Sequence, residues 1–214
     1  MKKYFLISAS LFLSFIGWTL LIYWVDVQAI GPNSSSVGFA TVNKIFHNLT
    51  GVHMSLYTIT DWLGLVPVAV GFAFAILGLV QLIKRKSLLK VDFNILVLGV
   101  FYIITMFLYL LFESVVINYR PVLINGFLEA SYPSSTTLLV LCVMPTAVLQ
   151  LKNRIKNVNL KKATVFAINA FTIFMVVGRL ISGVHWLSDI IGGILLSAAL
   201  VTLYHAVCKA VKQL

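Results

Sequence analysis

Three strongly polar residues, Arg179, His185 and Asp189, stand together in the stretch GRLISGVHWLSD. The sequence on both sides is apolar and long enough to cross a bilayer. Charged groups at the edge of a membrane span are energetically costly and therefore indicate a functional site. If the helix that continues through IIGGILLSAALVTLYH begins near His185, the spacing of four places His185 and Asp189 on one face. We expect the carboxylate to hold one imidazole nitrogen and to leave the other one basic.

Two other stretches concentrate polar residues in the same way, ESVVINYRP at 113–121 and SYPSSTT at 131–137. The predicted topology brings all three stretches to one membrane face. Guanidinium groups match phosphate oxygens, and free N–H groups point outward at the start of a helix. Two arginines near a hydroxyl-rich helix start therefore indicate an anion site. The predicted ligand is a phosphate held at the membrane surface.

The composition, 60% hydrophobic and only 10% charged over 214 residues, excludes a soluble domain. We predict an all-α, polytopic membrane helix bundle. Its transmembrane spans leave no room for a separate soluble domain, so we expect residues 1–214 to form a single domain. The six predicted transmembrane helices lie at about residues 4–25, 62–83, 93–113, 134–151, 163–181 and 186–208.

The net charge of +10 could suggest nucleic acid as a partner, but the basic residues alternate between connections instead. Connections rich in Lys and Arg are cytoplasmic by the positive-inside rule. We therefore predict cytoplasmic termini, an extracytoplasmic site, the bilayer as surroundings and no nucleic-acid partner. The basic groups are Lys2 and Lys3, Lys84 to Lys90, Lys152 to Lys162, and Lys209 with Lys212.

A segment after the first span has apolar residues at intervals of three and four, from Phe39 to Leu56. This pattern predicts a short amphipathic helix on the extracytoplasmic surface. Such a helix either packs over the bundle or gates the substrate.

In order and spacing, the three polar stretches resemble the motifs of the phosphatidic acid phosphatase type 2 superfamily, which also includes the vanadium haloperoxidases. Its members carry K-x6-R-P, P-S-G-H and S-R-x5-H-x3-D, and the membrane branch has a six-helix bundle. The corresponding residues here are Glu113, Arg120 and Pro121, then Pro133 to Thr136, then Gly178, Arg179, His185 and Asp189.

The resemblance implies a lipid phosphatase that needs no metal or other cofactor. His185 would be the nucleophile that takes the phosphoryl group, and Asp189 would orient it. The phosphate-binding residues would be Arg120, Arg179, Ser134, Ser135 and Thr136, with Glu113 and Tyr119 as possible accessory residues.

Three positions depart from the motifs. Glu113 replaces a lysine, Thr136 replaces the histidine that protonates the leaving group, and Gly178 replaces a serine. A threonine hydroxyl is a poor acid, and general acid help is worth roughly 10²- to 10⁴-fold. A phosphate leaving group needs a proton less than an alkoxide does, which favours a polyprenyl diphosphate as the membrane substrate over a simple lipid phosphate.

Other readings follow from the same residues. His47, His53, Tyr119 or Tyr132 could supply the proton instead. A family member with a disabled site would bind lipid phosphates as a carrier, sensor or partner subunit, and a third possibility is transfer of the headgroup to another lipid. The compact chain and the resemblance favour a bacterial cytoplasmic membrane. No pattern specifies an oligomeric state.

Overall fold

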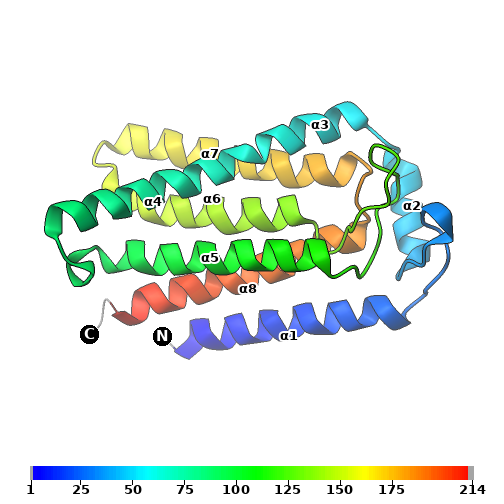
Figure 1. Ribbon diagram of the computed structural model, residues 1–214, viewed down its shortest axis with the longest axis horizontal. Coiled ribbons are helices and arrows are strands. Elements are labelled where there is room, and N and C mark those ends of the chain that lie inside the picture. The colour runs from blue at the N-terminus through cyan, green and yellow to red at the C-terminus, as the bar shows by residue number, and fades with distance from the viewer. Residues whose placement is uncertain (1, 212–214) are drawn as a thin grey trace.

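The computed structural model describes residues 2–211, and the regular elements within them are helices (Figure 1). Lys212, which we assigned to the basic C-terminal segment, lies outside the described residues. Two single 3-10 turns, Pro32–Ser34 and Leu88–Lys90, lie in connections. The α-helices are α1 Lys2–Trp24, α2 Ala40–Thr50, α3 Met54–Leu63, α4 Leu65–Arg85, α5 Phe93–Ser114, α6 Ser135–Arg154, α7 Val158–Ile181 and α8 Leu187–Val211.

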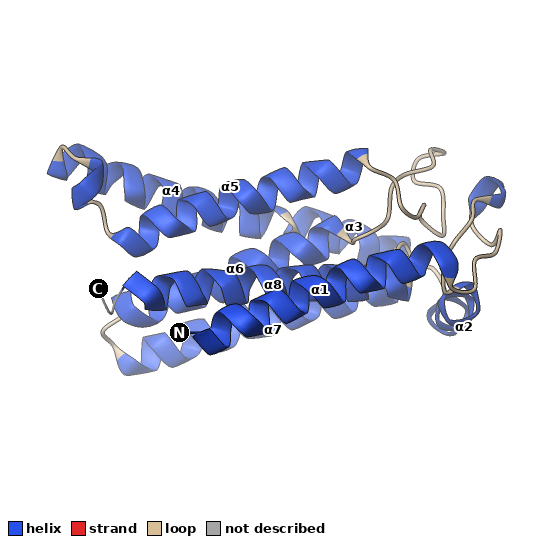
Figure 2. Ribbon diagram, turned by 90° about the horizontal axis from the view of Figure 1, so that it is seen from below, coloured by secondary structure: helices blue, strands red, loops and turns tan. Residues whose placement is uncertain are grey.

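The six-span bundle expected from the sequence is confirmed. Six helical segments among the described residues are long and apolar enough to cross a membrane, and α3 and α4 together make the second one. The protein is therefore an integral membrane protein. In Figure 2, α4 and α5 form one side of the bundle, and α1, α7 and α8 form the other.

Helix α6 is the centre of the bundle. Two thirds of its apolar window (67%) is buried, against 11–22% for the spans formed by α1, α4, α5 and α7. Leu138 and Cys142 on α6 are fully buried and pack with Leu196 and Leu200 of α8. Large apolar side chains on the outer helices, such as Phe166, remain exposed, as expected for surfaces that face lipid. Helix α6 consequently packs against α4, α5, α7 and α8.

The amphipathic segment differs from its prediction. It is broken at residues 51–53 into α2 and α3, and α3 does not lie on the surface but runs on into α4. Gly51 adopts a positive φ of 70°, which ends α2, whereas Gly64 between α3 and α4 keeps helical angles. Both helices share the same apolar periodicity, and for that reason the pattern concealed the break. The second span therefore begins at Met54 instead of residue 62.

The two ends of the bundle differ in character (Figure 1). The chain ends and the basic connections lie at one end. Helix α2 and the loop formed by residues 115–134 lie at the other, which we call the α2 end. The three polar stretches of the sequence all reach the α2 end.

Candidate active site

A hairpin-like loop, residues 118–131, delivers polar side chains to the α2 end from both of its arms. Asn125 and Gly126 at its tip have positive φ angles of 50° and 84°, as in the two-residue turns that reverse a chain. The Ser131 amide donates to the Asn118 carbonyl (2.9 Å), and the Arg120 amide donates to the Glu129 carbonyl (3.1 Å). The turn thereby sets Arg120 beside Glu129 and Asn118 beside Ser131.

A chain of hydrogen bonds links the buried carboxylate of Asp189 to the imidazole of His185 through the hydroxyl of Ser131. The Ser131 hydroxyl donates to Asp189 Oδ2 (2.5 Å), and its oxygen lies 3.0 Å from His185 Nδ1. Because the hydroxyl proton goes to the carboxylate, the oxygen accepts from Nδ1–H. This arrangement leaves Nε2 unprotonated and basic.

The direct contact that we expected between Asp189 and His185 is therefore replaced by one through Ser131. Helix α8 begins only at Leu187, so His185 lies before the helix and does not share a face with Asp189. Asp189 instead accepts from the Trp186 amide (2.9 Å) at the helix start. Asn118 Nδ2 lies 3.3 Å from the other carboxylate oxygen.

Two buried guanidinium groups stand beside the imidazole. Arg179 is 1% exposed and Arg120 is 5% exposed. Their Cζ atoms lie 4.9 and 5.7 Å from the centre of the Tyr57 ring, so one aromatic ring contacts both cations. Arg179 Nη2 lies 3.5 Å from His185 Nε2. Arg179 is thus in direct reach of the basic imidazole nitrogen, and Arg120 is near Arg179 across the Tyr57 ring.

Each arginine retains nitrogen atoms that could bind an anion. Nε and Nη1 of Arg120 and of Arg179 are buried and have no hydrogen-bond partner within the described part of the chain. Their nearest carboxylates are Glu129 at 3.2 Å from Arg120 Nε and Asp61 at 3.5 Å from Arg179 Nη1. Buried N–H groups are normally satisfied, and these nitrogens therefore indicate a site for phosphate oxygens.

The first turn of α6 contributes amide groups to the same region. The first hydrogen bond of the helix runs from the Leu138 amide to the Ser134 carbonyl, so the amides of residues 135–137 precede the ladder. The polar groups of Ser134 are already engaged, since its hydroxyl accepts from Thr137 (3.0 Å) and its amide donates to the Asp189 carbonyl (3.1 Å). Ser134 therefore braces the helix start, and the amides that precede the ladder belong to Ser135, Thr136 and Thr137.

Electrostatics keep His185 neutral. Burial lowers the pKa of His185 well below its ordinary value, and the charges of Arg120 and Arg179 lower it further. A neutral imidazole with Nδ1–H held by Ser131 keeps Nε2 unprotonated at pH 7, and its electron pair faces Arg179 Nη2, which donates to it over 3.5 Å. The chemistry that this arrangement supports is nucleophilic attack on an electrophile clamped by the two arginines.

Close packing between α7 and α3 explains why position 178 is a glycine. A Cβ at this position would lie 2.8 Å from Thr60 Cγ2, on the side of α7 that faces α3. The small residue lets α3 approach α7 closely, which is how Tyr57 and Asp61 reach Arg179. A serine at position 178, as in the motif, would therefore require α3 to lie farther from α7.

Three further predicted residues, Glu113, Tyr119 and Thr136, form no hydrogen bond or ion pair with the arginines within residues 2–211. Glu113 is exposed at the end of α5, and the carboxylate beside Arg120 is Glu129 instead. Tyr119 contributes its carbonyl, which accepts from Trp186 Nε1 (2.8 Å). The methyl group of Thr136 faces Gly64, 3.7 Å from where a Cβ would stand.

Of the alternative proton donors, Tyr132 and His53 make other hydrogen bonds, whereas Nδ1 of His47 is buried without a partner within residues 2–211. Tyr132 is buried and shares a hydrogen bond of 2.7 Å with Thr19 of α1. His53 Nε2 lies 2.8 Å from the Thr50 carbonyl. The ring of His47 packs on Trp186, and burial lowers its pKa. Among residues 2–211, no three His, Cys, Asp or Glu side chains gather as a group that could hold a metal.

Sequence reasoning missed several residues of this site: Tyr57, Asp61, Asn118, Glu129 and Ser131. Ser131 stood inside a stretch that we singled out, but its partners are more than fifty residues away in the chain. The Asn-Gly pair at 125–126 is a turn signal that could have predicted the pairing of Arg120 with Glu129. Tyr57 and Asp61 carried no such signal.

Replacing Ser131 by alanine should lower kcat by about 10- to 100-fold and leave KM nearly unchanged. The imidazole would lose the group that orients it, whereas the two arginines that bind the phosphate would remain. The measurement is phosphate release from a lipid phosphate in detergent. Ser131→Thr keeps the hydroxyl and should retain most of the rate, and Ser14→Ala, at an exposed serine of α1, is the matched control. Full activity of Ser131→Ala would show that the relay has no role.

Comparison with known proteins gives the family and supports the fold. None of the curated proteins matches the chain significantly. The crystal structure of a transmembrane PAP2 type phosphatidylglycerolphosphate phosphatase from Bacillus subtilis is similar, with a TM-score of 0.54 and 20% identity over 95% of this chain and 96% of that chain. The model of the PAP2 superfamily matches residues 68–212. With most of its length matched, including the three motif regions, the chain belongs to the PAP2 superfamily, as its motifs indicated.

Proposed function

We propose that the protein is a membrane lipid phosphatase that works through a phosphohistidine at His185. The observation that carries the proposal is the position of His185 Nε2, 3.5 Å from a guanidinium whose other nitrogens have no hydrogen-bond partner among residues 2–211. A phosphate held by those nitrogens would stand next to an unprotonated imidazole nitrogen. Membership of the PAP2 superfamily supports the same reaction.

In the proposed reaction, Nε2 forms a bond to phosphorus while the bond from phosphorus to the lipid oxygen breaks. The lipid leaves as an oxyanion with the electron pair of that bond and takes its proton from water. The imidazole gains a positive charge, which Asp189 stabilises through Ser131. The arginines and the first-turn amides of α6 offset the charge on the non-bridging oxygens. Water then attacks phosphorus, inorganic phosphate leaves, and Nε2 recovers its electron pair. The residues themselves supply nucleophile and charge stabilisation.

We place the site on the extracytoplasmic side of a bacterial cytoplasmic membrane. The support is the charge distribution, since the basic connections and the chain ends lie at the end opposite to the α2 end (Figure 1).

A polyprenyl diphosphate is the substrate that we favour, because no strong acid stands at position 136. The test compares phosphate release from a polyprenyl diphosphate, phosphatidic acid and phosphatidylglycerol phosphate by purified protein. We expect kcat/KM for the diphosphate to be about 10²-fold higher than for the two monoesters, because its phosphate leaving group does not need a general acid. Equal rates on the monoesters would refute the preference, and no release from any of them would favour a lipid-phosphate binding protein.

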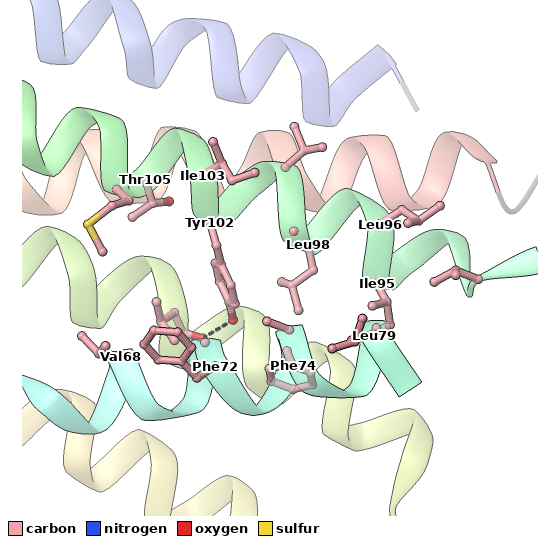
Figure 3. A pocket seen from close by; sticks show the side chains of 18 of the residues that line it. Val68, Phe72, Phe74, Leu79, Ile95, Leu96, Leu98, Tyr102, Ile103 and Thr105 are labelled. Atoms are coloured by element: carbon pink, nitrogen blue, oxygen red, sulfur yellow. Dashed lines mark hydrogen bonds between the residues drawn. The ribbon is translucent and has the colours of Figure 1, made fainter. Parts of the chain in front are cut away.

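An apolar groove offers a place for the hydrocarbon chain (Figure 3). It has a volume of about 640 Å³ and lies between α4 and α5, with Leu139 and Val143 of α6 behind it. It runs along α4 from Pro67 to Leu82, roughly 22 Å at the rise of a helix. Its end near the site, at Leu139, is one turn of α6 from Ser135. A lipid could enter there from the side and keep its phosphate among the arginines.

Filling the groove should weaken binding of long chains only. Gly99→Leu adds a side chain where nothing lies within 4 Å of a Cβ, and Gly99 lines the groove. Displacing two or three methylene groups should raise KM for a long-chain lipid phosphate about tenfold. A short-chain, water-soluble phosphate should be hydrolysed as before. Gly17→Leu on α1, which is equally open but outside the groove, is the control, and an equal loss on both substrates would contradict the assignment.

A further inference from the structure

Asp61 joins the buried arginine pair to solvent. It lies on α3, one turn after Tyr57, and its side chain is 56% exposed, whereas that of Arg179 is 1% exposed. Its Oδ1 is 3.5 Å from Arg179 Nη1. The chain thus places an exposed anion against a cation that is otherwise enclosed.

This contact is an ion pair without a hydrogen bond. Arg179 Nη1 remains unbonded although Asp61 is within 3.5 Å. The other terminal nitrogen of the same guanidinium, Nη2, lies 3.5 Å from His185 Nε2. A phosphate that binds both terminal nitrogens of Arg179 beside the imidazole would therefore take Nη1 from Asp61.

Asp61 can give up this contact at little cost. Its carboxylate has no other ion pair or hydrogen bond among residues 2–211, and it is already more than half exposed. Only the Asp61 side of the pair is exposed, and water solvates this carboxylate once it separates from Arg179. Movement of one carboxylate into water is then sufficient to free the guanidinium.

We propose that Asp61 is an exchangeable counter-ion of Arg179, which substrate phosphate displaces and which returns to speed the release of inorganic phosphate. The proposal rests on the phosphatase function proposed above and adds a residue that sets the affinity for product. Without such a competitor, a phosphate dianion between two buried guanidinium groups would leave slowly. Asp61 is a positioning residue, because it acts through Arg179.

Asp61→Asn tests the proposal, since it removes the charge and keeps the shape. Binding of inorganic phosphate to the purified full chain in detergent is measured by calorimetry, and product inhibition is measured with a lipid phosphate. We expect phosphate to bind about fivefold more tightly than to the unchanged protein, the range that a partly exposed pair allows. Asp61→Glu keeps the charge and should bind phosphate like the unchanged protein.

The control is Asp26→Asn, which removes one negative charge at the same end of the protein. Asp26 accepts hydrogen bonds from the Thr41 amide and Gln28, and its carboxylate has no arginine partner. This variant should leave phosphate affinity unchanged. A merely structural role of Asp61 predicts weaker binding in Asp61→Asn, the opposite of our expectation.

Phosphate affinity that is unchanged or lower in Asp61→Asn, or binding by neither protein, would overturn the proposal. Calorimetry needs no turnover, which separates this failure from that of the proposed function. Tighter binding by Asp61→Asn without hydrolysis of any lipid phosphate would support Asp61 and refute the phosphatase. Hydrolysis of a lipid phosphate together with an unchanged phosphate affinity of Asp61→Asn would support the phosphatase and refute the role of Asp61.

Discussion

His185→Gln is expected to abolish phosphate release, with a loss of at least ~10³-fold in kcat, because the electron pair of an amide nitrogen is delocalised into the carbonyl and is a very poor nucleophile. The ring lies between Ser131 on one side and Arg179 on the other, so the exchange changes the nucleophile and leaves the clamp. Release is measured with a lipid phosphate, and covalent labelling is measured after an alkaline quench with radioactive substrate. Labelled protein should form with the unchanged chain only.

His53→Gln is the matched control, because His53 is exposed and bonds the carbonyl of Thr50 in its own segment. It should keep full activity and labelling. Persistent release by His185→Gln would rule out the nucleophile.

The pH dependence gives a second check on His185. Burial and the two arginines lower its pKa, so the free nucleophile persists as the pH falls through 6.5 and is lost only at lower pH. The acid limb of kcat/KM should therefore lie below pH 6.5. A limb at the ordinary histidine value would show that the nucleophile is not this buried group.

The membrane architecture could be predicted because it depends on local composition. Runs of apolar residues identify spans, and the alternation of basic connections orders them. The three polar stretches were therefore correctly assigned to one end of the bundle. Arg120, Arg179 and His185 belong to different elements, and the structure brings them together as that topology requires.

Two features could not be predicted: the hydrogen bonds that Ser131 makes to His185 and Asp189, and the position of Asp61 beside Arg179. The first depends on tertiary contacts, and the second depends on one break in a helix. The spacing of His185 and Asp189 implied a shared helix face, but α8 begins two residues after His185 and a distant serine fills the gap. Periodicity could not show that Gly51 ends α2, since α3 continues the same pattern. Helix α3 after that break carries Asp61, whose exposed carboxylate lies 3.5 Å from Arg179.

Arg179→Lys is expected to lower kcat/KM by about 10²- to 10³-fold, although it preserves the charge, because a lysine cannot present several nitrogens in a fixed plane. Arg179 contacts Asp61 with Nη1 and His185 with Nη2, and its plane lies over Tyr57. An ammonium group provides one point of contact and cannot hold a phosphate oxygen while it also faces the imidazole. Both kcat/KM and the affinity for inorganic phosphate should fall.

Arg154→Lys is the control for this substitution, since Arg154 lies at the other end of the bundle beside Gln150 and Asp92. It should leave kcat/KM unchanged. The thermal unfolding midpoint in detergent shows whether a variant remains folded. A folded Arg179→Lys protein with nearly full activity would mean that charge alone holds the phosphate, and the geometric match of the guanidinium to the phosphoryl oxygens would then have no part in catalysis.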